Sequence, residues 1–469
     1  MIPFNNIFRY VAFILIVFLI PACATYYQKN ESLMQAVYTS DFASANKLLA
    51  DDAKWEKQKR NQLLFYLNKG TVLFMDGQHE ASNIYFRKAD YLVEDFNKDV
   101  GDFAVTLLVN AKYTNYGGEN FEQILIHYYT TINYLALNKT EEALVEGKRM
   151  LSKMQRITDA YKSKNKYKRD AFAHNLLGMI YDIRGEYNDA FIAYRNALQI
   201  YQDDYTKNFD MAIPLQLKKD LIRTANKVGF YEEQLAYEKE FKLALERIQD
   251  ESAEVLFFWN NGLGPIKEQN AFNIMILPAG NGIVNLVNPE LGISMSWPVS
   301  DKNDRQDMLD MNFIRLALPK YVSRVPLYDR ANLEFNNTRY PLQMAENINA
   351  IAYKSLQDRM AKELAIGLGR VIAKQLAVHQ LKKNKDQQGF AAAAMIYGAV
   401  SEQADTRNWQ LLPYAIHYAR VKVKPGKQQI KFVASEGSKS KMEKNFEVDL
   451  NPNQTKVLIT QTLDFSGYR

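Results

Sequence analysis

The fold of the first half of this chain is decided by residues 171–204, which read AFAHNLLGMIYDIRGEYNDAFIAYRNALQIYQDD. Apolar and small residues recur there at intervals of three and four on each side of a central turn, and this spacing predicts two helices joined as a hairpin. Gly178 and Ala190 would let the two helices approach closely, and the rings of Tyr181 and Tyr194 would fill the gaps beside them. The segment therefore predicts one unit of a helical-hairpin repeat.

The placement of the small and aromatic side chains matches a tetratricopeptide repeat, whose unit is about 34 residues long. The matching residues are Leu177, Gly178, Tyr181, Ala190, Tyr194 and Ala197. Two weaker copies precede this unit, one marked by Gly70 and Ala89 and the other by Ala143. Stacked hairpins form a solenoid whose concave face binds extended peptides or other proteins. We therefore expect an all-α tetratricopeptide-like solenoid over residues 23–250, acting either as a protein-protein interaction scaffold or only as a spacer between other parts.

The composition of the chain changes near Glu254. The apolar and aromatic run Val255–Trp259 ends in a turn rich in asparagine and glycine, which predicts a β-strand. Similar runs predict strands at Ile283–Val287, Ile293–Trp297, Phe313–Leu318, Leu333–Phe335, Ile416–Val423, Gln429–Ala434, Asn445–Leu450 and Lys456–Thr462. A proline-free apolar stripe over Ala345–Leu381 predicts a long helix between them. We therefore expect a β-sandwich-like domain over residues 251–469 with a helical insertion at about 345–404, and an α+β fold for the whole chain.

The N-terminal residues 1–22 combine Arg9, a short apolar run and the small residue Ala22 directly before Cys23, the only cysteine of the chain. This arrangement predicts a secretory signal peptide. It resembles a bacterial lipobox, which implies cleavage before Cys23 and fatty acylation of that residue, for example with palmitate. The apolar run is shorter than the roughly 20 residues that cross a bilayer, whereas two or more acyl chains hold a protein stably on its surface.

The residue after the cysteine, Ala24, bears on the membrane to which the protein goes. By the same resemblance, an aspartate at this place would retain a lipoprotein in the inner membrane. We therefore expect a lipid-anchored protein on the periplasmic side of the outer membrane of a Gram-negative bacterium.

The composition argues against several classes of function. A formal net charge of +6 over 469 residues is too small a bias for a nucleic-acid-binding surface. Five scattered histidines and a single cysteine predict no metal site, and we expect no cofactor. The run Gly292-Ile293-Ser294-Met295-Ser296 ends in serine where a nucleophile elbow needs glycine. We expect no enzyme; the alternative, a cell-wall or carbohydrate-processing enzyme with its site in the C-terminal domain, stays open.

Two further segments each allow two interpretations. The basic run Tyr161–Arg169 is typical of a solvated linker or helix face, and otherwise would contact anionic lipid headgroups or cell-wall polymer. The alanine-rich run Phe390–Val400 is too short to span a bilayer, so it is either a tightly packed helix or a contact with a membrane surface or a partner.

Asp405, Arg407 and Trp409 occupy alternate positions of one stretch. In an extended backbone these three side chains would point to the same side. Such a set either holds a carboxylate or sugar ligand by charge and stacking, or locks a turn to the neighbouring sheet.

Four short motifs carry a resemblance to a known family. They are Asn261–Lys267 (NGLGPIK), Ala317–Tyr321 (ALPKY), Ala404–Pro413 (ADTRNWQLLP) and Ala419-Arg420. With these motifs the chain resembles an uncharacterised family of Gram-negative lipoproteins that joins tetratricopeptide-like hairpins to a β-containing domain. The resemblance covers nearly the whole mature chain and implies a role at the cell envelope. It provides no catalytic residue to transfer.

Overall fold

The computed structural model describes residues 26–51, 56–98, 114–160, 169–246, 252–290, 292–383, 403–437 and 440–466. The predicted signal peptide, Cys23, all but the last residue of the basic run and the alanine-rich run Phe390–Val400 lie outside these residues. Helices occupy the chain up to Phe241, and strands begin at Ala253. Within these described ranges no helix is both long and apolar enough to cross a membrane.

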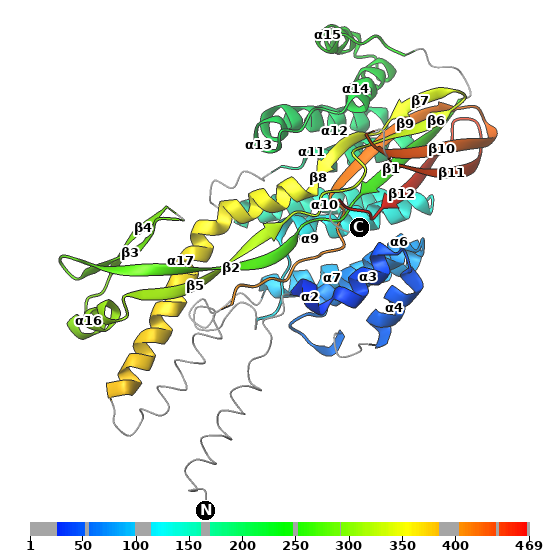
Figure 1. The fold of residues 1–469 in the computed structure, drawn as a ribbon. Helices are drawn as coiled ribbons and strands as arrows, with labels where there is room; N and C mark the ends of the chain where they lie inside the picture. The colour runs from blue at the N-terminus through cyan, green and yellow to red at the C-terminus, as the bar shows by residue number, and fades with distance from the viewer. Residues whose placement is uncertain are drawn as a thin grey trace, which may run out of the picture.

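Antiparallel helix pairs build the first half of the molecule (Figure 1). After the short α2 (Tyr26–Lys29), they are α3 (Glu31–Tyr38) with α4 (Phe42–Asp51), α6 (Gln62–Met75) with α7 (His79–Lys98), α9 (Asn120–Ala136) with α10 (Thr140–Ala160), α11 (Ala171–Ile183) with α12 (Tyr187–Ile200), and α14 (Leu215–Lys227) with α15 (Tyr231–Phe241). A π-helical turn, Tyr201–Tyr205, and α13 (Thr206–Phe209) follow α12. Gly77, Gly185 and Gly229 turn three of these hairpins with φ between 75° and 80°, a conformation that glycine adopts without steric cost.

The small residues of the repeat pattern lie where neighbouring helices touch. A Cβ added to Gly178 would lie 2.5 Å from Cδ1 of Tyr194, so the tyrosine ring packs directly on the backbone of α11. Gly70 meets the ring of Phe86 in the same way. Gly147, which stands where the pattern has an aromatic residue, instead leaves room for side chains of the next hairpin. Ala89, Ala143, Ala190 and Ala197 are fully buried, Leu177 is buried, and Tyr181 is half-buried beneath Lys148.

Two four-stranded sheets pack face to face in the second half. The central sheet has the order β12-β1-β9-β8 and consists of β12 (Thr455–Thr462), β1 (Ala253–Asn261), β9 (Ala415–Val423) and β8 (Gln343–Asn347). The outer sheet has the order β11-β10-β6-β7 and consists of β11 (Ser440–Leu450), β10 (Gly426–Glu436), β6 (Arg330–Phe335) and β7 (Thr338–Pro341). Alternate residues of β1 and β10 meet between the sheets, and Phe257 stacks on Phe432 with 5.5 Å between ring centroids. All neighbouring strands are antiparallel except β1 and β12, which are parallel.

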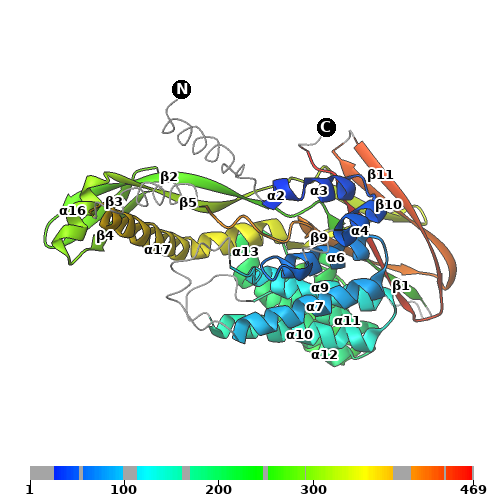
Figure 2. The same ribbon diagram turned by 90° about the horizontal axis from the view of Figure 1, so that it is seen from below.

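A third sheet forms an arm that projects from the body (Figures 1 and 2). Its order is β4-β3-β2-β5, and its strands are β2 (Ile266–Ala279), β3 (Ile283–Asn288), β4 (Ile293–Pro298) and β5 (Phe313–Val322). The helices α16 (Lys302–Asp310) and α17 (Ile348–Lys383) cover one face of this sheet, and the three parts share a separate hydrophobic core.

The arm corrects two sequence-based expectations. The predicted strands Ile283–Val287, Ile293–Trp297 and Phe313–Leu318 belong to the arm and not to the packed pair of sheets. The predicted helical insertion, in its described part, is α17, which packs against β5 as the cover of the arm. The long strand β2 is not predicted because its polar start, Lys267–Asn270, interrupts the alternation of apolar and polar residues.

The helices cover the second face of the central sheet, so the molecule has three layers with a continuous core between helices and sheet. The hydroxyl of Tyr128 on α9 donates to Oδ1 of Asn260 at 2.8 Å, and Nδ2 of Asn175 on α11 donates to the Tyr418 hydroxyl at 3.1 Å. Gln461 on β12 donates to the Met75 carbonyl of α6, and the Gln216 amide of α14 donates to Gln343 on β8. The first helix of each of the four hairpins from α6 onward therefore faces the chain's own strands. The helix face on which we expected a partner to bind is covered by this sheet.

Candidate functional site

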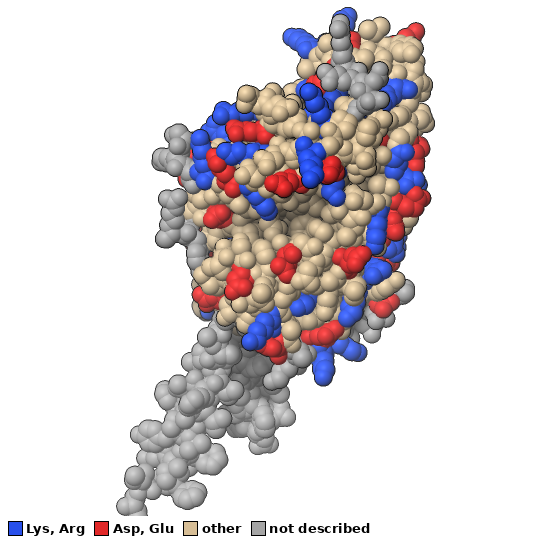
Figure 3. Space-filling view, turned by 90° about the vertical axis from the view of Figure 1, so that its right-hand side faces the viewer, with Lys and Arg blue, Asp and Glu red and all other residues tan. Residues whose placement is uncertain are grey.

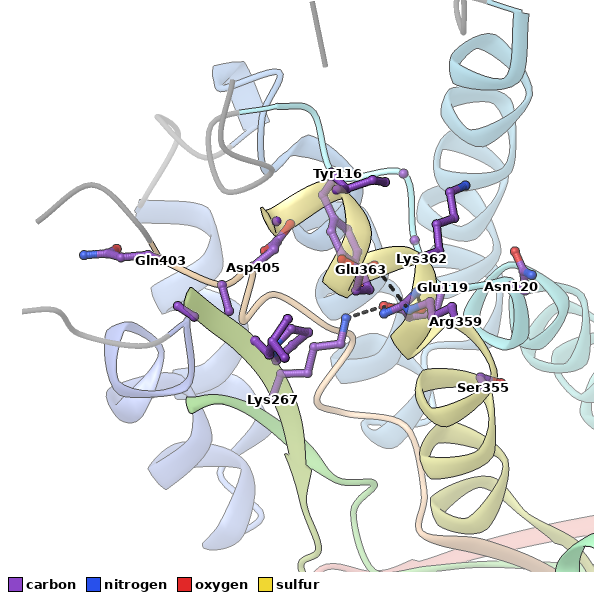
Figure 4. A pocket seen from close by; sticks show the side chains of 18 of the residues that line it. Tyr116, Glu119, Asn120, Lys267, Ser355, Arg359, Lys362, Glu363, Gln403 and Asp405 are labelled. Atoms are coloured by element: carbon purple, nitrogen blue, oxygen red, sulfur yellow. Dashed lines mark hydrogen bonds and ion pairs between the residues drawn. The ribbon is translucent and has the colours of Figure 1, made fainter. Parts of the chain in front are cut away.

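A cavity of about 370 Å³ lies at the root of the arm (Figure 4). Its walls come from the segment before α9, from β2 and β5, from α17 and from the segment that follows residue 402. Charged side chains of both signs line it. They include Glu119, Lys267, Asp358, Arg359, Lys362, Glu363 and Asp405.

Glu119 is the centre of this group of charges. Its carboxylate accepts hydrogen bonds from Nζ of Lys267 on β2 and from both terminal nitrogens of Arg359 on α17, with 2.7 Å between Arg359 Nη2 and Glu119 Oε1. Glu119 itself precedes α9, and its side chain and that of Glu122 cap each other's backbone in a capping box. One carboxylate thus joins the helical layer, the arm sheet and the arm helix. Burial by itself would raise the pKa of Glu119. The positive charges of Arg359 and Lys267 outweigh this effect and lower the pKa to about 2.

Glu122 lies one helical turn away, behind the wall of the cavity. It accepts hydrogen bonds from the Tyr116 hydroxyl at 2.5 Å, the Glu119 amide at 2.9 Å and the Trp409 amide at 2.7 Å. Burial, and then the charge of Glu119, raise its pKa to about 7. Two carboxyl groups with pKa values driven apart are typical of acid-base catalysis. Here both carboxyl oxygens of Glu122 accept hydrogen bonds from the chain itself, and the residue is 1% exposed, so its carboxyl group is not presented to the cavity.

The structure places Asp405, Arg407 and Trp409 in a buried segment without regular secondary structure, not in a strand. Arg407 Nη2 contacts Asp405 Oδ2 at 2.7 Å, and Arg407 Nη1 donates to the backbone carbonyls of Arg60 and Thr114. Trp409 is 1% exposed, and its Nε1 donates to the Thr71 hydroxyl at 2.9 Å. The three residues hold this segment against the helices and not against a neighbouring sheet. The Trp409 ring has no free face on which a sugar could stack.

Two of the sequence motifs meet beside this segment. The Gly264 amide donates to the Leu412 carbonyl at 2.6 Å, and Asn408 Nδ2 donates to the Pro265 carbonyl at 2.8 Å. Arg324 Nε donates to the Gly264 carbonyl at 2.7 Å. These motifs therefore shape the root of the arm.

Arg420, from the fourth motif, lies in a second group of charges that the sequence analysis missed. It contacts Asp182 at 2.8 Å, Asp220 at 3.3 Å and Glu254 at 2.6 Å, and Arg223 contacts both Asp182 and Asp220. A cavity of about 330 Å³ adjoins this group. Glu119 and Arg359 were also missed, because a lone charged residue on a helical segment carries no sequence signal for burial.

The chemistry of the arm-root cavity follows from its ion pairs. Asp405 contacts Arg407, Asp358 contacts Lys354, and Glu363 lies 3.6 Å from Arg359. Each acid is thus neutralised by a cation. In the part of the chain that the structure describes, no three His, Cys, Asp or Glu side chains are grouped so that they could hold a metal ion. The arrangement suits a clamp between parts of the molecule better than a catalytic centre.

The fold defines this molecule as an α+β protein in which helical hairpins and a sheet share one core. No protein-family model matches the sequence, and no curated protein matches it either.

Solved structures similar to parts of the chain include a MamA protein, with 15% identity over 46% of this chain and 96% of that chain at a TM-score of 0.29. The apo form of RapI matches 50% of this chain and 58% of that chain, with 15% identity and a TM-score of 0.35. BtubC from P. vanneervenii matches 45% of this chain and 75% of that chain, with 16% identity and a TM-score of 0.33. Likeness at this level carries no argument about function.

Proposed function

We propose that this protein is a scaffold for protein-protein interaction at a bacterial cell envelope. In this proposal acylated Cys23 anchors it on the periplasmic side of the outer membrane, and the second helices of its hairpins bind a partner protein. One observation carries the proposal: the first helices are covered by the chain's own sheet, while the second helices expose a row of large apolar side chains.

This row, which we call the outer helix row, runs across four neighbouring hairpins. Its members are Ile84 and Tyr91 on α7, Val145 on α10, Ile192 on α12, and Tyr231 and Leu235 on α15. Tyr91, Tyr231 and Leu235 are each more than 60% exposed. A single exposed apolar side chain is ordinary, but a series across adjacent helices indicates an interaction surface.

On the face drawn in Figure 3 the charges favour a protein partner over a nucleic acid. Figure 3 shows a face of the molecule on which Lys and Arg alternate with Asp and Glu. Such a surface produces no field of a single sign, which nucleic-acid binding requires.

The alternative, a cell-wall or carbohydrate-processing enzyme, would need an acid in the arm-root cavity that is free to donate or accept a proton. The carboxylates that line this cavity contact cations instead, and Glu122 is shielded from it. The scaffold is therefore the function that this geometry supports better.

Site-specific photo-crosslinking in intact cells tests the partner surface. A benzophenone amino acid at Tyr91 or Leu235 should give a cross-linked product of defined mass, since both side chains belong to the outer helix row. The same amino acid at Asn445, an exposed position of β11, is the control. Equal products at Asn445, or none at Tyr91 and Leu235, would contradict the proposed surface.

The anchor is tested separately. Mass spectrometry of the N-terminal peptide should find acyl chains on Cys23, and the variant Cys23→Ser should remain uncleaved because the processing step needs the modified cysteine. A Cys23→Ser chain that is cut at the same bond and stays as firmly in the membrane fraction would contradict the anchor.

A further inference from the structure

The arm sheet has one face covered by helices and one face that is not. Ile274, Ile276, Ile314 and Leu316 point to the covered face and are at most 4% exposed, because they pack with α16 and α17. The alternate residues of the same strands point the other way. We call this second side the outer arm face.

Apolar side chains dominate the outer arm face near the tip of the arm. Phe313 pairs with Met275 across β5 and β2, and they are 57% and 39% exposed. Leu277 is 42% exposed, and Val287 and Ile283 on β3 are half-buried beside these residues. Exposed large apolar residues on β2 and β5, flanked by half-buried ones on β3, form a patch of a kind that a soluble surface normally avoids.

The polar positions of this face show which kind of partner fits. Among the described outward positions from Asn273 to the tip, Arg315 is the one charged residue, and those without a large apolar side chain are otherwise Asn, Ser, Ala or Pro. No Asp or Glu lies among the described outward positions of these strands. A patch with apolar side chains, one cation and no anion suits a bilayer surface that carries anionic headgroups.

The chain's own N-terminus indicates where the bilayer lies. Three peptide units separate Cys23 from Tyr26, so the two Cα atoms are at most about 11 Å apart. Tyr26 is buried, and its amide donates to the Thr406 hydroxyl at 3.1 Å, beside the start of β2. The helix α2 also contacts β2 directly. An acyl chain on Cys23 would therefore enter the membrane next to the root of the arm.

The outer arm face is on the same side of the molecule as this attachment. In Figure 2 the strands β2 and β5 lie between α17 and the edge of the molecule along which α2 and α3 lie. The helices α7, α10 and α12, which carry part of the outer helix row, lie at the opposite edge. A membrane that holds the N-terminus thus faces the arm sheet and leaves the outer helix row free.

We propose that the outer arm face, through Phe313, Met275, Leu277 and Arg315, binds the surface of the bilayer in which Cys23 is anchored. This inference rests on the proposed lipid anchor. Met275 lies nine residues beyond the start of β2, about 30 Å along the strand. Two membrane contacts this far apart would hold the body in one orientation, with its partner-binding helices turned to the periplasm.

The test uses the full, processed chain reconstituted into vesicles of phosphatidylethanolamine, with or without phosphatidylglycerol. Because Cys23 is the only cysteine and acylation consumes its thiol, a single introduced cysteine is the only site for a thiol-reactive fluorophore. The positions are Leu277→Cys and Ser296→Cys on the outer arm face, with Gln199→Cys on α12 as the matched control. Brominated lipids should quench the label at 277 and 296 several-fold more than at 199.

The outcomes separate this proposal from the anchor. Labelling of the unsubstituted chain would show a free Cys23 thiol and overturn the anchor. In that case, stronger quenching at 296 than at 199 would still support contact of the outer arm face with the bilayer, and equal quenching would overturn it. A blocked Cys23 with equal quenching at all three positions would overturn the bilayer contact while the anchor stands. The bilayer contact is supported if the labels at 277 and 296 are quenched and if Arg315→Gln reduces this quenching only in vesicles that contain phosphatidylglycerol. If the labels at 277 and 296 become shielded from solvent only after an envelope-protein fraction is added, the bilayer contact is overturned and a protein partner is favoured.

Discussion

Arg420 of β9 and Asp182 of α11 form an ion pair of 2.8 Å between side chains that are 4% and 3% exposed. The pair joins the central sheet to the helices that cover it. Arg420 also contacts Asp220 and Glu254, so one guanidinium joins three carboxylates from different elements. Arg223 shares two of these carboxylates, Asp182 and Asp220, with Arg420. Burial opposes the charge of Asp182, but Arg420 and Arg223 hold its pKa below the ordinary value.

We expect Arg420→Ala to destabilise the protein by about 3–5 kcal/mol, because it leaves buried carboxylates without their counter-charge. Urea unfolding followed by circular dichroism measures the loss. The control is Arg339→Ala, which removes an ion pair to Glu334 from a side chain that is 75% exposed, and surface changes of this kind stay within about 0.5 kcal/mol. A similar shift in both variants would contradict a structural role for the network.

Glu119→Gln should loosen the root of the arm and change how the stability of the fold depends on pH in the acid range. The folded pKa of Glu119 is about 2 and its ordinary value is 4.5. A depressed pKa contributes stability that is present above pH 4.5 and is lost as the pH falls through the folded value, about 3 kcal/mol in total. Between pH 4.5 and 2 the variant should therefore lose less stability than the parent chain. In the parent chain Glu122, with a pKa of about 7, is already protonated throughout that window.

Hydrogen exchange measured by mass spectrometry locates the effect. In Glu119→Gln, exchange should increase at the start of β2 and around Arg359 in α17, because Lys267 and Arg359 lose their shared partner. The tip strands β3 and β4 serve as the internal control. Unchanged exchange at the arm root would contradict the clamp.

Glu346→Gln should stabilise the protein at neutral pH. Burial, and then the nearby charge of Asp170, raise the pKa of Glu346 well above its ordinary 4.5. A raised carboxyl pKa means that the folded state prefers the protonated form, so stability falls as the pH rises above the unfolded value. Glutamine can still accept the hydrogen bond from the Tyr205 hydroxyl, which lies 3.1 Å from Oε2. The gain in melting temperature should be present at pH 8 and disappear near pH 4, and Glu447→Gln on the exposed side of β11 should show no such dependence.

Gly178→Ala should separate α11 from α12, because the new Cβ would lie 2.5 Å from Cδ1 of Tyr194. Overpacking of a well-filled core costs about 1–3 kcal/mol. Gly117→Ala is the matched control, since a Cβ there would meet no atom within 4 Å and the backbone conformation is permitted to alanine. Thermal unfolding compares them, and a Gly178→Ala chain as stable as the control would contradict the close approach.

Much of the fold is predictable because its signals are local. The closeness of Gly178 to Tyr194 follows from a spacing that lies inside one hairpin, and the strands from Val255–Trp259 onward follow from short apolar runs. The assignment of those strands to sheets does not follow, since the runs that form the arm look like the runs that form the packed pair. The candidate site is less predictable still: Lys267 and Asp405 lie in recognised motifs, but nothing near Glu119 or Arg359 in the sequence indicates that they meet.

The sequence by itself determined the helical hairpins, the strand segments and a lone cysteine after a signal-like segment, because each depends on residues close together in the chain. Only the tertiary structure decided that the sheet fills the inner side of the hairpins, leaving the outer helix row and the outer arm face exposed. It also decided that Glu119 joins Lys267 and Arg359, from 148 and 240 positions away. The physical reason is burial: a charge can leave water only where distant segments bring its counter-charges to it, and no local pattern records that meeting.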